Sequence, residues 1–306
     1  MKESNHNFQV LWDKLGLQQI QYKITGDLCA LMSLFGLMSC SSSHPCLYCP
    51  LRRSKGEWEN SAVELRTMGS LASQYAGWVS DGSKYDTEHT SRYQSTVGPV
   101  VVRSVDDSDD LTVLEKCAPP GVHLLLAVND ILRPHCIKFF NSEQHLMLVL
   151  KTEVGVVPHS YQGKDGNFEG PQCDKILNKL SVLAPYLLND KEYQDGFLLL
   201  GLLESLKKVK DSFFGLELME NHEEVMDDFK INLDMAHIGA EVPITPKLHI
   251  ISIHVIQWAR RTGKGLAKAN EAAVEASHHV WWNVWKHYKV CDETSPAFKE
   301  NGKSQC

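Results

Sequence analysis

The sequence predicts a helix-rich α/β fold, and two observations carry this prediction. Near the start of the chain, residues 20–25 (IQYKIT) have the pattern of a short β-strand that runs directly into an apolar helical segment at residues 28–37. From residue 170 onward, apolar side chains recur almost entirely at helical spacing. A strand–helix opening followed by a long helical stretch indicates an α/β core that is interrupted by a large helical insertion.

The opening segment contains a helix, the strand and a cysteine-bearing loop. Residues 7–19 place apolar side chains at helical spacing, and Gly16 predicts where that helix ends. After the strand and the helix at residues 28–37, a serine-rich loop at 39–43 leads into the sequence HPCLYCP at residues 44–50. The loop therefore presents two cysteines between prolines.

The middle of the chain alternates helices with polar connections. A helix is expected over residues 57–79, a turn-rich surface loop over 81–98 and a short extended piece at 99–102. The acidic run within residues 106–110 predicts a solvated loop. A strongly apolar helix is expected over residues 123–132, where two prolines precede it.

The second half is predominantly helical. Thr245 precedes Pro246, so it predicts the N-cap of a helix. Helices are expected at residues 142–153, 171–188, 193–209, 217–232, 246–261 and 266–288, with a glycine-rich loop at 159–170. The elements divide the chain into a first core segment at residues 1–55, a helical insertion at 56–243, C-terminal core helices at 244–290 and a polar tail at 291–306.

Composition indicates the cellular compartment. Residues 1–23 lack the apolar centre of a secretory signal, and no stretch reaches the roughly 20 apolar residues that a membrane-spanning helix needs. The nine cysteines are an odd, scattered set, which favours free thiols in a reducing compartment. We therefore expect an intracellular protein, nuclear or cytoplasmic, without membrane contact. The formal net charge of −7 argues against a broadly basic nucleic-acid-binding surface.

Four residues have the types and spacing of zinc ligands. Cys46 and Cys49 form a CxxC motif, and His249 and His254 have four residues between them. On a regular helix the two histidines would diverge by roughly 140°, but His249 lies in the first turn after a proline, where the helix can distort. Four protein ligands leave no open position, so the expected zinc is structural. The alternative is an incidental CxxC with histidines in the core.

Carboxylates at two places are candidate catalytic groups. Asp27 ends the predicted strand, and the alternative is that it is the N-cap of the following helix. Glu271 and Glu275 lie four residues apart, so they share one helix face with His279. The alternative there is a charged face in contact with solvent.

The order of several segments resembles the catalytic region of the V(D)J recombinase subunit and its transposase relatives, including the Transib group. The segments are KITGDLCALMSLFG, HPCLYC, APPGVHLLLAVNDIL, YQGKDGNFEGPQCDKIL and PKLHIISIHVIQWARRTGKGLAKANEAAVEASHHVWWNVW, and together they cover about residues 20 to 290. The resemblance implies a partial RNase H-like core with a long helical insertion. It also implies a zinc ion held by Cys46, Cys49, His249 and His254.

The resemblance further implies DNA cleavage and strand transfer by an Asp-Asp-Glu triad with two Mg²⁺ or Mn²⁺ ions. The second Asp of the family corresponds to Asp27. The Glu corresponds to Glu275, with Glu271 as the fallback, although Ala276 stands where the family has Ser. The first Asp should precede Asp27 by roughly a hundred residues, and this chain has only 26 residues there. The triad is therefore expected to be incomplete and Asp27 and Glu275 vestigial.

Three functional hypotheses follow from these features. The first is a transposase-like recombinase that is inactive as this chain and binds DNA weakly, through basic residues that flank the two zinc motifs: Arg52, Arg53, Lys55, Arg260, Arg261, Lys264 and Lys268. The second is a domesticated, non-catalytic module that zinc stabilises and that binds a protein or nucleic acid. The third is an unrelated metalloenzyme that uses Glu271, Glu275, His278 and His279. A homo-oligomer is compatible with all three, and the sequence identifies no protein partner.

Overall fold

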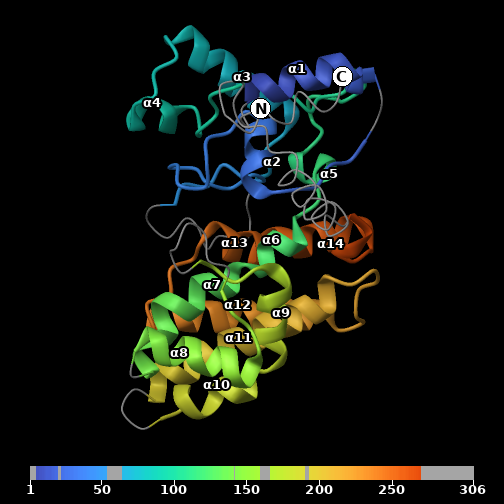
Figure 1. Ribbon diagram of the computed structural model, residues 1–306. Coiled ribbons are helices and arrows are strands. Elements are labelled where there is room, and N and C mark those ends of the chain that lie inside the picture. Colours follow the sequence, from blue (N-terminus) through green and yellow to red (C-terminus); the bar gives the residue numbers. More distant parts are fainter. Residues whose placement is uncertain are drawn as a thin grey trace, which may run out of the picture. The chain divides into compact units, whose positions relative to one another are not determined.

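The computed structural model describes residues 5–19, 22–53, 64–140, 142–158, 166–189 and 193–269. The chain forms two compact units, residues 1–270 and 271–306, and every described residue belongs to the first. Figure 1 shows that helices make up most of the described part. The helix-rich prediction is therefore confirmed. The segments proposed at 1–55 and 56–243 both lie within the first unit, and their boundaries stay a prediction.

The first helix ends where its sequence predicts. Helix α1 spans Asn5–Leu15, and Gly16 then adopts a left-handed backbone with φ of 63° before the short turn η1 at Leu17–Gln19. Glycine adopts this conformation without the steric penalty that a Cβ atom imposes. Helix α2 follows at Leu28–Leu34 and buries its apolar face, including Leu31 and Met32.

The strand expected at residues 20–25 is reduced to a single bridge in its described part, residues 22–25. Ile24 donates its backbone N–H to the Lys116 carbonyl at 2.9 Å and accepts from the Ala118 N–H at 3.0 Å, which makes a parallel bridge to Cys117. Within the described ranges every β-pairing is an isolated bridge of this kind. An RNase H-like sheet is therefore not seen there, and that finer part of the fold stays a prediction.

The segment at residues 99–102 ends in a turn at Val101 and Val102, and among the described residues it forms no β-bridge of the extended kind that its valines predict. Val101 and Val102 are fully or nearly fully buried, and the Val101 N–H donates to the Leu34 carbonyl at 2.9 Å. The apolar run therefore reflects burial against helix α2. β-propensity is a weak prior, because it mainly measures how well a side chain packs.

Two short helices occupy regions that are predicted as loops or left unassigned. After α3 (Met68–Ser80), helix α4 (Thr87–Arg92) begins at the N-cap Asp86, whose carboxylate accepts from the His89 N–H at 2.8 Å. Helix α5 (Val113–Lys116) begins with a capping box. The side-chain caps explain why such short helices form inside polar sequence.

The acidic run at residues 106–110 is only partly a solvated loop. Asp107 is buried and accepts from the Lys116 ammonium at 2.7 Å, and both side chains are under a tenth exposed. The Lys116 ammonium also donates to Ser104 and lies 4.1 Å from the centre of the Tyr22 ring. A buried charge must be paired, and here the partner lies nine residues away.

The middle of the chain is a series of short helical segments. They are α6 (Gly121–Leu125), α7 (Ala127–Ile131), η3 (Leu132–Cys136), η4 (Ile137–Phe139), α8 (Glu143–Val149) and η5 (Leu150–Val154). The single helix expected over residues 123–132 is therefore divided. Ser142 caps α8, where its hydroxyl accepts from the His145 N–H at 3.1 Å.

Helices α11 and α12 form the most extensive helix pair in the described structure. They follow α9 (Gly170–Asn178) and α10 (Leu180–Leu187) and span Tyr193–Phe213 and His222–Gly239. A Cβ atom on Gly239 would lie 2.4 Å from the Leu198 side chain, and one on Gly201 would lie 2.9 Å from Asn232. The two glycines therefore let the helices approach closely.

The helix expected over residues 246–261 is present but changes its hydrogen-bonding pattern inside. It begins as α13 (Pro246–His249), continues as the π-helix η6 (Ile250–Val255) and ends as α14 (Ile256–Thr262). Thr245 is its N-cap, as predicted. The turn η7 (Leu266–Ala269) follows, and the remainder of the helix expected at 266–288 lies outside the described residues.

No helix in the described ranges has both the length and the apolar character that crossing a lipid bilayer requires.

Candidate metal centre

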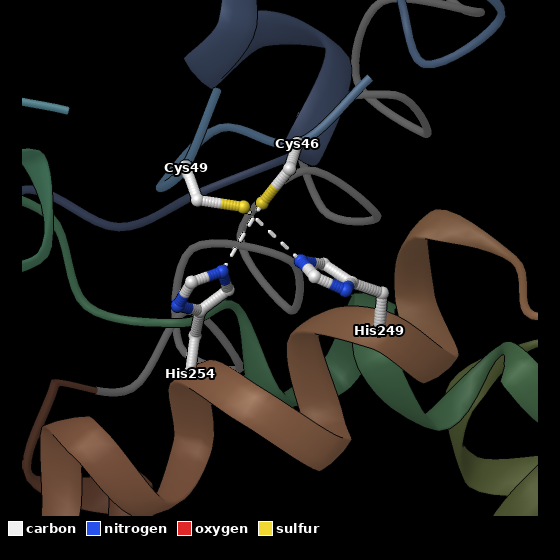
Figure 2. Close-up of side chains that lie close together, drawn as sticks. All are labelled: Cys46, Cys49, His249 and His254. Atoms are coloured by element: carbon white, nitrogen blue, oxygen red, sulfur yellow. Dashed lines mark hydrogen bonds between the residues drawn. The ribbon is translucent and has the colours of Figure 1, made fainter. Parts of the chain in front are cut away.

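The CxxC loop and the α13–η6 helix bring two cysteines and two histidines together, as Figure 2 shows. The sulfur atoms of Cys46 and Cys49 and one ring nitrogen each of His249 and His254 all lie within 4.8 Å of one another. Each of the four residues has 0% exposure. Within the described ranges this is the one group of three or more such residues whose geometry could hold a metal ion.

The contacts inside the cluster pair each sulfur with one imidazole. Cys46 Sγ lies 3.3 Å from His254 Nε2, and Cys49 Sγ lies 3.2 Å from His249 Nε2. Tetrahedral zinc with ordinary bond lengths would place sulfur and nitrogen about 3.6 Å apart. The donor set and its spacing therefore fit a tetrahedral metal such as zinc after a shift of a few tenths of an ångström.

The π-helix explains how histidines with four residues between them reach one side of a helix. In an α-helix, residues five apart point in clearly different directions. In η6 the backbone follows the i→i+5 pattern of a π-helix, whose wider turn brings residues five apart much closer to one face than an α-helix does. The rings of His249 and His254 consequently face the same site, with their centres 5.1 Å apart.

Neighbouring polar groups orient two of the four ligands. His254 Nδ1 lies 2.8 Å from Gln257 Oε1, so the ring donates its Nδ1 proton there and keeps a lone pair on Nε2 for a metal. The backbone N–H of Tyr48 donates to Cys46 Sγ at 3.3 Å. Both contacts favour the protonation states that metal binding requires.

A buried arginine holds the backbone of the CxxC loop in position through hydrogen bonds. Arg66 is 2% exposed, and its Nε donates to the carbonyls of Cys46 at 3.3 Å and Cys49 at 3.1 Å. Its Nη2 donates to the Gln94 carbonyl at 3.0 Å, and its own N–H donates to the Tyr48 carbonyl at 2.8 Å. One side chain thus holds both ends of the loop that carries the cysteines.

The cysteine thiols differ in acidity. Burial raises the pKa of Cys46, and the adjacent Cys49 raises it further. Burial acts on Cys49 in the same direction, but hydrogen bonds from Cys46 and the Leu51 N–H, together with the Arg66 charge, hold the pKa of Cys49 below its ordinary value. Burial lowers the pKa of Arg66 to about 10, so its guanidinium stays charged at neutral pH. Cys49 is therefore the thiol of the pair that gives up its proton more readily.

Asp130, on α7, fixes the start of the histidine-bearing helix. Its carboxylate accepts from Thr245 Oγ1 at 2.8 Å and from Lys247 Nζ at 2.9 Å. Thr245 Oγ1 also accepts from the Leu248 N–H at 3.4 Å, which caps α13. The position of His249 is therefore tied to α7 as well as to its own helix.

The structure gives Asp27 a local role. Its Oδ1 accepts from the backbone N–H groups of Cys29 and Ala30, both at 2.9 Å, which makes it the N-cap of α2. Its Oδ2 lies 3.3 Å from His123 Nδ1, and the side chain is 43% exposed. The N-cap alternative to a catalytic role is thus what the described residues display. Glu271, Glu275, His278 and His279 lie outside them.

The basic residues expected to form a patch do not share one environment. Arg260 is bound by the Glu223 carboxylate through two of its nitrogens. Arg261 lies 3.3 Å from Glu115 Oε1 and donates to Thr112. Arg52 and Arg53 are solvent-exposed, and Lys55 lies outside the described residues.

Sequence reasoning missed two residues that support the cluster. Gln257 follows His254 by three positions, and residues three apart are neighbours on a helix, so a search for polar partners at that spacing would have found it. Arg66 carries no comparable signal. It is a lone arginine between Leu65 and Thr67, and its role depends on a loop seventeen residues earlier.

Comparison with known proteins assigns neither a family nor a function to this chain. No protein-family model matches the sequence, and no curated protein matches it either. The functional argument therefore rests on the residues and geometry of this chain.

Proposed function

We propose that the cluster is a structural zinc site and that the chain is a zinc-stabilised protein of the transposase type that binds DNA without cutting it. The convergence of Cys46, Cys49, His249 and His254 in one buried site carries this proposal. The resemblance to the recombinase and transposase family supplies the DNA-binding part. The four residues that the resemblance implies as ligands are the four that come together.

The donor set favours zinc over other common ions. Two thiolates and two imidazoles suit the tetrahedral coordination of zinc, whereas magnesium and calcium prefer oxygen ligands. When bound, zinc would cross-link the CxxC loop to a helix about 200 residues later. Closing so long a loop adds stability that neither segment has by itself.

The arrangement favours a structural over a catalytic role. Catalytic zinc sites keep a position for water or substrate, but here four protein ligands would complete the tetrahedron. The four residues are also fully buried, so solvent has no direct access to the ion. The protein around the ion therefore serves to hold it, and its own residues Arg66 and Gln257 orient the ligands.

Absence of cleavage is the second part of the proposal. Two-metal chemistry needs several carboxylates around ions about 4 Å apart. One carboxylate oxygen of Asp27 accepts hydrogen bonds from two backbone amides, and the other lies 3.3 Å from His123 Nδ1. In the described ranges, no other carboxylate joins Asp27 in a metal-binding group. These observations favour a capping role for Asp27.

The test measures metal content, DNA cleavage and DNA binding on the same preparation. We expect about one zinc per chain, with zinc–sulfur distances near 2.3 Å and zinc–nitrogen distances near 2.0–2.1 Å by X-ray absorption. We expect no nicking of supercoiled plasmid in Mg²⁺ or Mn²⁺, but salt-sensitive retention of a labelled duplex. Cleavage that disappears in Asp27→Ala or Glu275→Ala would overturn the non-catalytic assignment. Full zinc occupancy in a Cys46→Ser, His249→Ala double variant would overturn the metal site.

A further inference from the structure

A basic cleft lies between residues 23–25 and the C-terminal end of α14. Its cavity volume is about 450 Å³. The charged side chains that line it are all positive, namely Lys23, Arg261 and Lys264. The metal-binding residues do not line this cleft, so it is a separate site.

The backbone on both sides of the cleft is held in place. On one side, the bridge of Ile24 to residues 116–118 fixes the neighbours Lys23 and Thr25. On the other side, Gly263 adopts a left-handed backbone with φ of 62° and donates its N–H to the Ala259 carbonyl at 2.8 Å. The turn sets Lys264 opposite residues 23–25, and Arg261 belongs to the last turn of α14.

Among the described residues, Glu115 is the acidic side chain that contacts a cation of the cleft, and the lining stays positive when it is included. Glu115 lies 3.3 Å from Arg261, and it is fixed by Thr112, whose N–H and hydroxyl donate to Glu115 Oε2 at 2.8 Å and 2.6 Å. Glu115 carries one negative charge, which acts on both Arg261 and Lys23, against three positive charges in the lining. The cleft therefore has the opposite sign to the chain as a whole, whose formal net charge is −7.

The adjacent Arg260 provides an internal contrast. Both of its donating nitrogens bind the Glu223 carboxylate, so its charge is neutralised by a matched partner. Lys23 instead lies over the Trp258 ring, with its Nζ 5.4 Å from the ring centre. A cation held against an aromatic face keeps its charge available to a ligand.

Trp258 contributes its aromatic ring to the wall of the cleft. The residue is 5% exposed, and its buried indole N–H has no hydrogen-bond acceptor among the described atoms. A buried donor without an acceptor is destabilising. That indole nitrogen is not accessible from the cleft, so Trp258 contributes to the cleft through the ring face that Lys23 lies over.

We propose that this cleft binds a phosphate group, with Lys23, Arg261 and Lys264 as its cationic contacts. Lysine supplies compact positive charge and arginine a planar pair of donors, which together suit a tetrahedral, multiply charged oxyanion. The natural source, a phosphodiester of nucleic acid, rests on the proposed function. The site itself rests on the cleft, and a free phosphate compound offers the same chemistry.

The experiment compares two charge-matched variants of the full chain. The cleft variant combines Lys23→Gln, Arg261→Gln and Lys264→Gln. The control combines Lys84→Gln, Lys151→Gln and Lys208→Gln, which removes the same formal charge at exposed lysines outside the cleft. Melting temperatures and zinc content establish that both variants are folded. The probes are a labelled DNA duplex and inorganic pyrophosphate.

For the cleft variant we expect at least a tenfold loss of duplex affinity relative to the control. The slope of log affinity against log salt should fall in magnitude by about 2–3, since each lost phosphate contact removes roughly 0.9. Pyrophosphate should compete with the duplex for the unmodified chain. This result would support the cleft as a phosphodiester site.

The other outcomes separate the cleft from the proposed function. Pyrophosphate binding that the cleft variant alone loses, without any duplex binding, would support the cleft and overturn the DNA-binding function. Duplex binding that is equal in both variants would overturn the cleft and leave the DNA-binding function standing. Failure of the unmodified chain to bind either probe would overturn both.

Discussion

The metal centre and the cap of helix α2 hold their polar side chains in opposite ways. In the metal centre, each sulfur contacts an imidazole about 200 residues away in the chain, and all four residues are fully buried. At the cap, Asp27 bonds backbone amides two and three residues further on and stays 43% exposed. Both regions contain residue types that can bind metals. Asp27 also has a distant neighbour in His123, but its capping bonds are local, whereas every contact between a sulfur and an imidazole in the metal centre is long-range.

This difference shows how to separate a metal site from a structural polar residue. Burying thiols and imidazoles together costs free energy unless they are paired, and a bound cation compensates that cost for all four. A carboxylate at a helix N-terminus already has its partners in the same turn. Distance along the chain combined with full burial is therefore the stronger sign of a metal site.

The largest expected effect is the loss of one zinc ligand. Cys46→Ser should abolish stoichiometric zinc binding and lower the free energy of unfolding by several kcal/mol, because structural zinc contributes about 10 kcal/mol in small metal-dependent folds. Metal analysis and chemical denaturation measure both. Cys29→Ser, at an exposed cysteine outside the cluster, is the control and should leave both values unchanged. Equal zinc content in the two variants would contradict the assignment of Cys46 as a zinc ligand.

The next effect concerns the arginine that holds the CxxC loop. Arg66→Met should lower the free energy of unfolding by about 2–4 kcal/mol, because the carbonyls of Cys46 and Cys49 lose a buried charged donor. The zinc affinity should fall as well, since the loop is no longer held in position. Arg53→Met, at an exposed arginine, should change stability by less than about 0.5 kcal/mol. Similar losses in both variants would show that Arg66 does not support the site.

The ligand residues could be predicted from the sequence because cysteine and histidine spacing is itself a chemical signal. What the sequence did not reveal is how His249 and His254 reach one face. The sequence predicts that the helix can distort after Pro246, and the structure shows a distortion. Its form, a π-helix over Ile250–Val255, was not predicted. Apart from Ser252 and His254, that segment is apolar, so its pattern does not distinguish a helical period of 3.6 from a wider one.

Elements whose form depends on distant packing were the least predictable. The run at residues 22–25 has a strand-like pattern, but it forms one bridge because its described partners are a loop around Cys117. Asp107 belongs to an acidic run that predicts solvent exposure, and its burial is explained only by Lys116. The helix that follows the N-cap Thr245 was predicted correctly because cap and helix are adjacent in sequence, whereas the short capped helices α4 and α5 were missed.

A smaller effect is expected from the residue that orients His254. Gln257→Leu should lower zinc affinity about 10- to 100-fold, because the Nδ1 proton loses its acceptor and the imidazole its fixed orientation. Gln257→Glu keeps an acceptor at the same place and should retain most of the affinity. Competition with a chelator of known affinity measures the difference. Equal affinities for the Leu and Glu variants would mean that the contact does not orient the ligand.

The smallest expected effect concerns Asp27, the N-cap of helix α2. Asp27→Ala should lower the free energy of unfolding by about 1 kcal/mol, because the Cys29 and Ala30 amides lose their acceptor, whereas Asp27→Asn should retain most of the cap. Zinc content should be unchanged in both, since neither variant touches the cluster. A metal-binding catalytic carboxylate would behave differently, because Asn removes the negative charge that a divalent ion requires. If Asp27→Asn is as stable as the unmodified chain but loses binding of Mn²⁺, the local account of Asp27 is wrong.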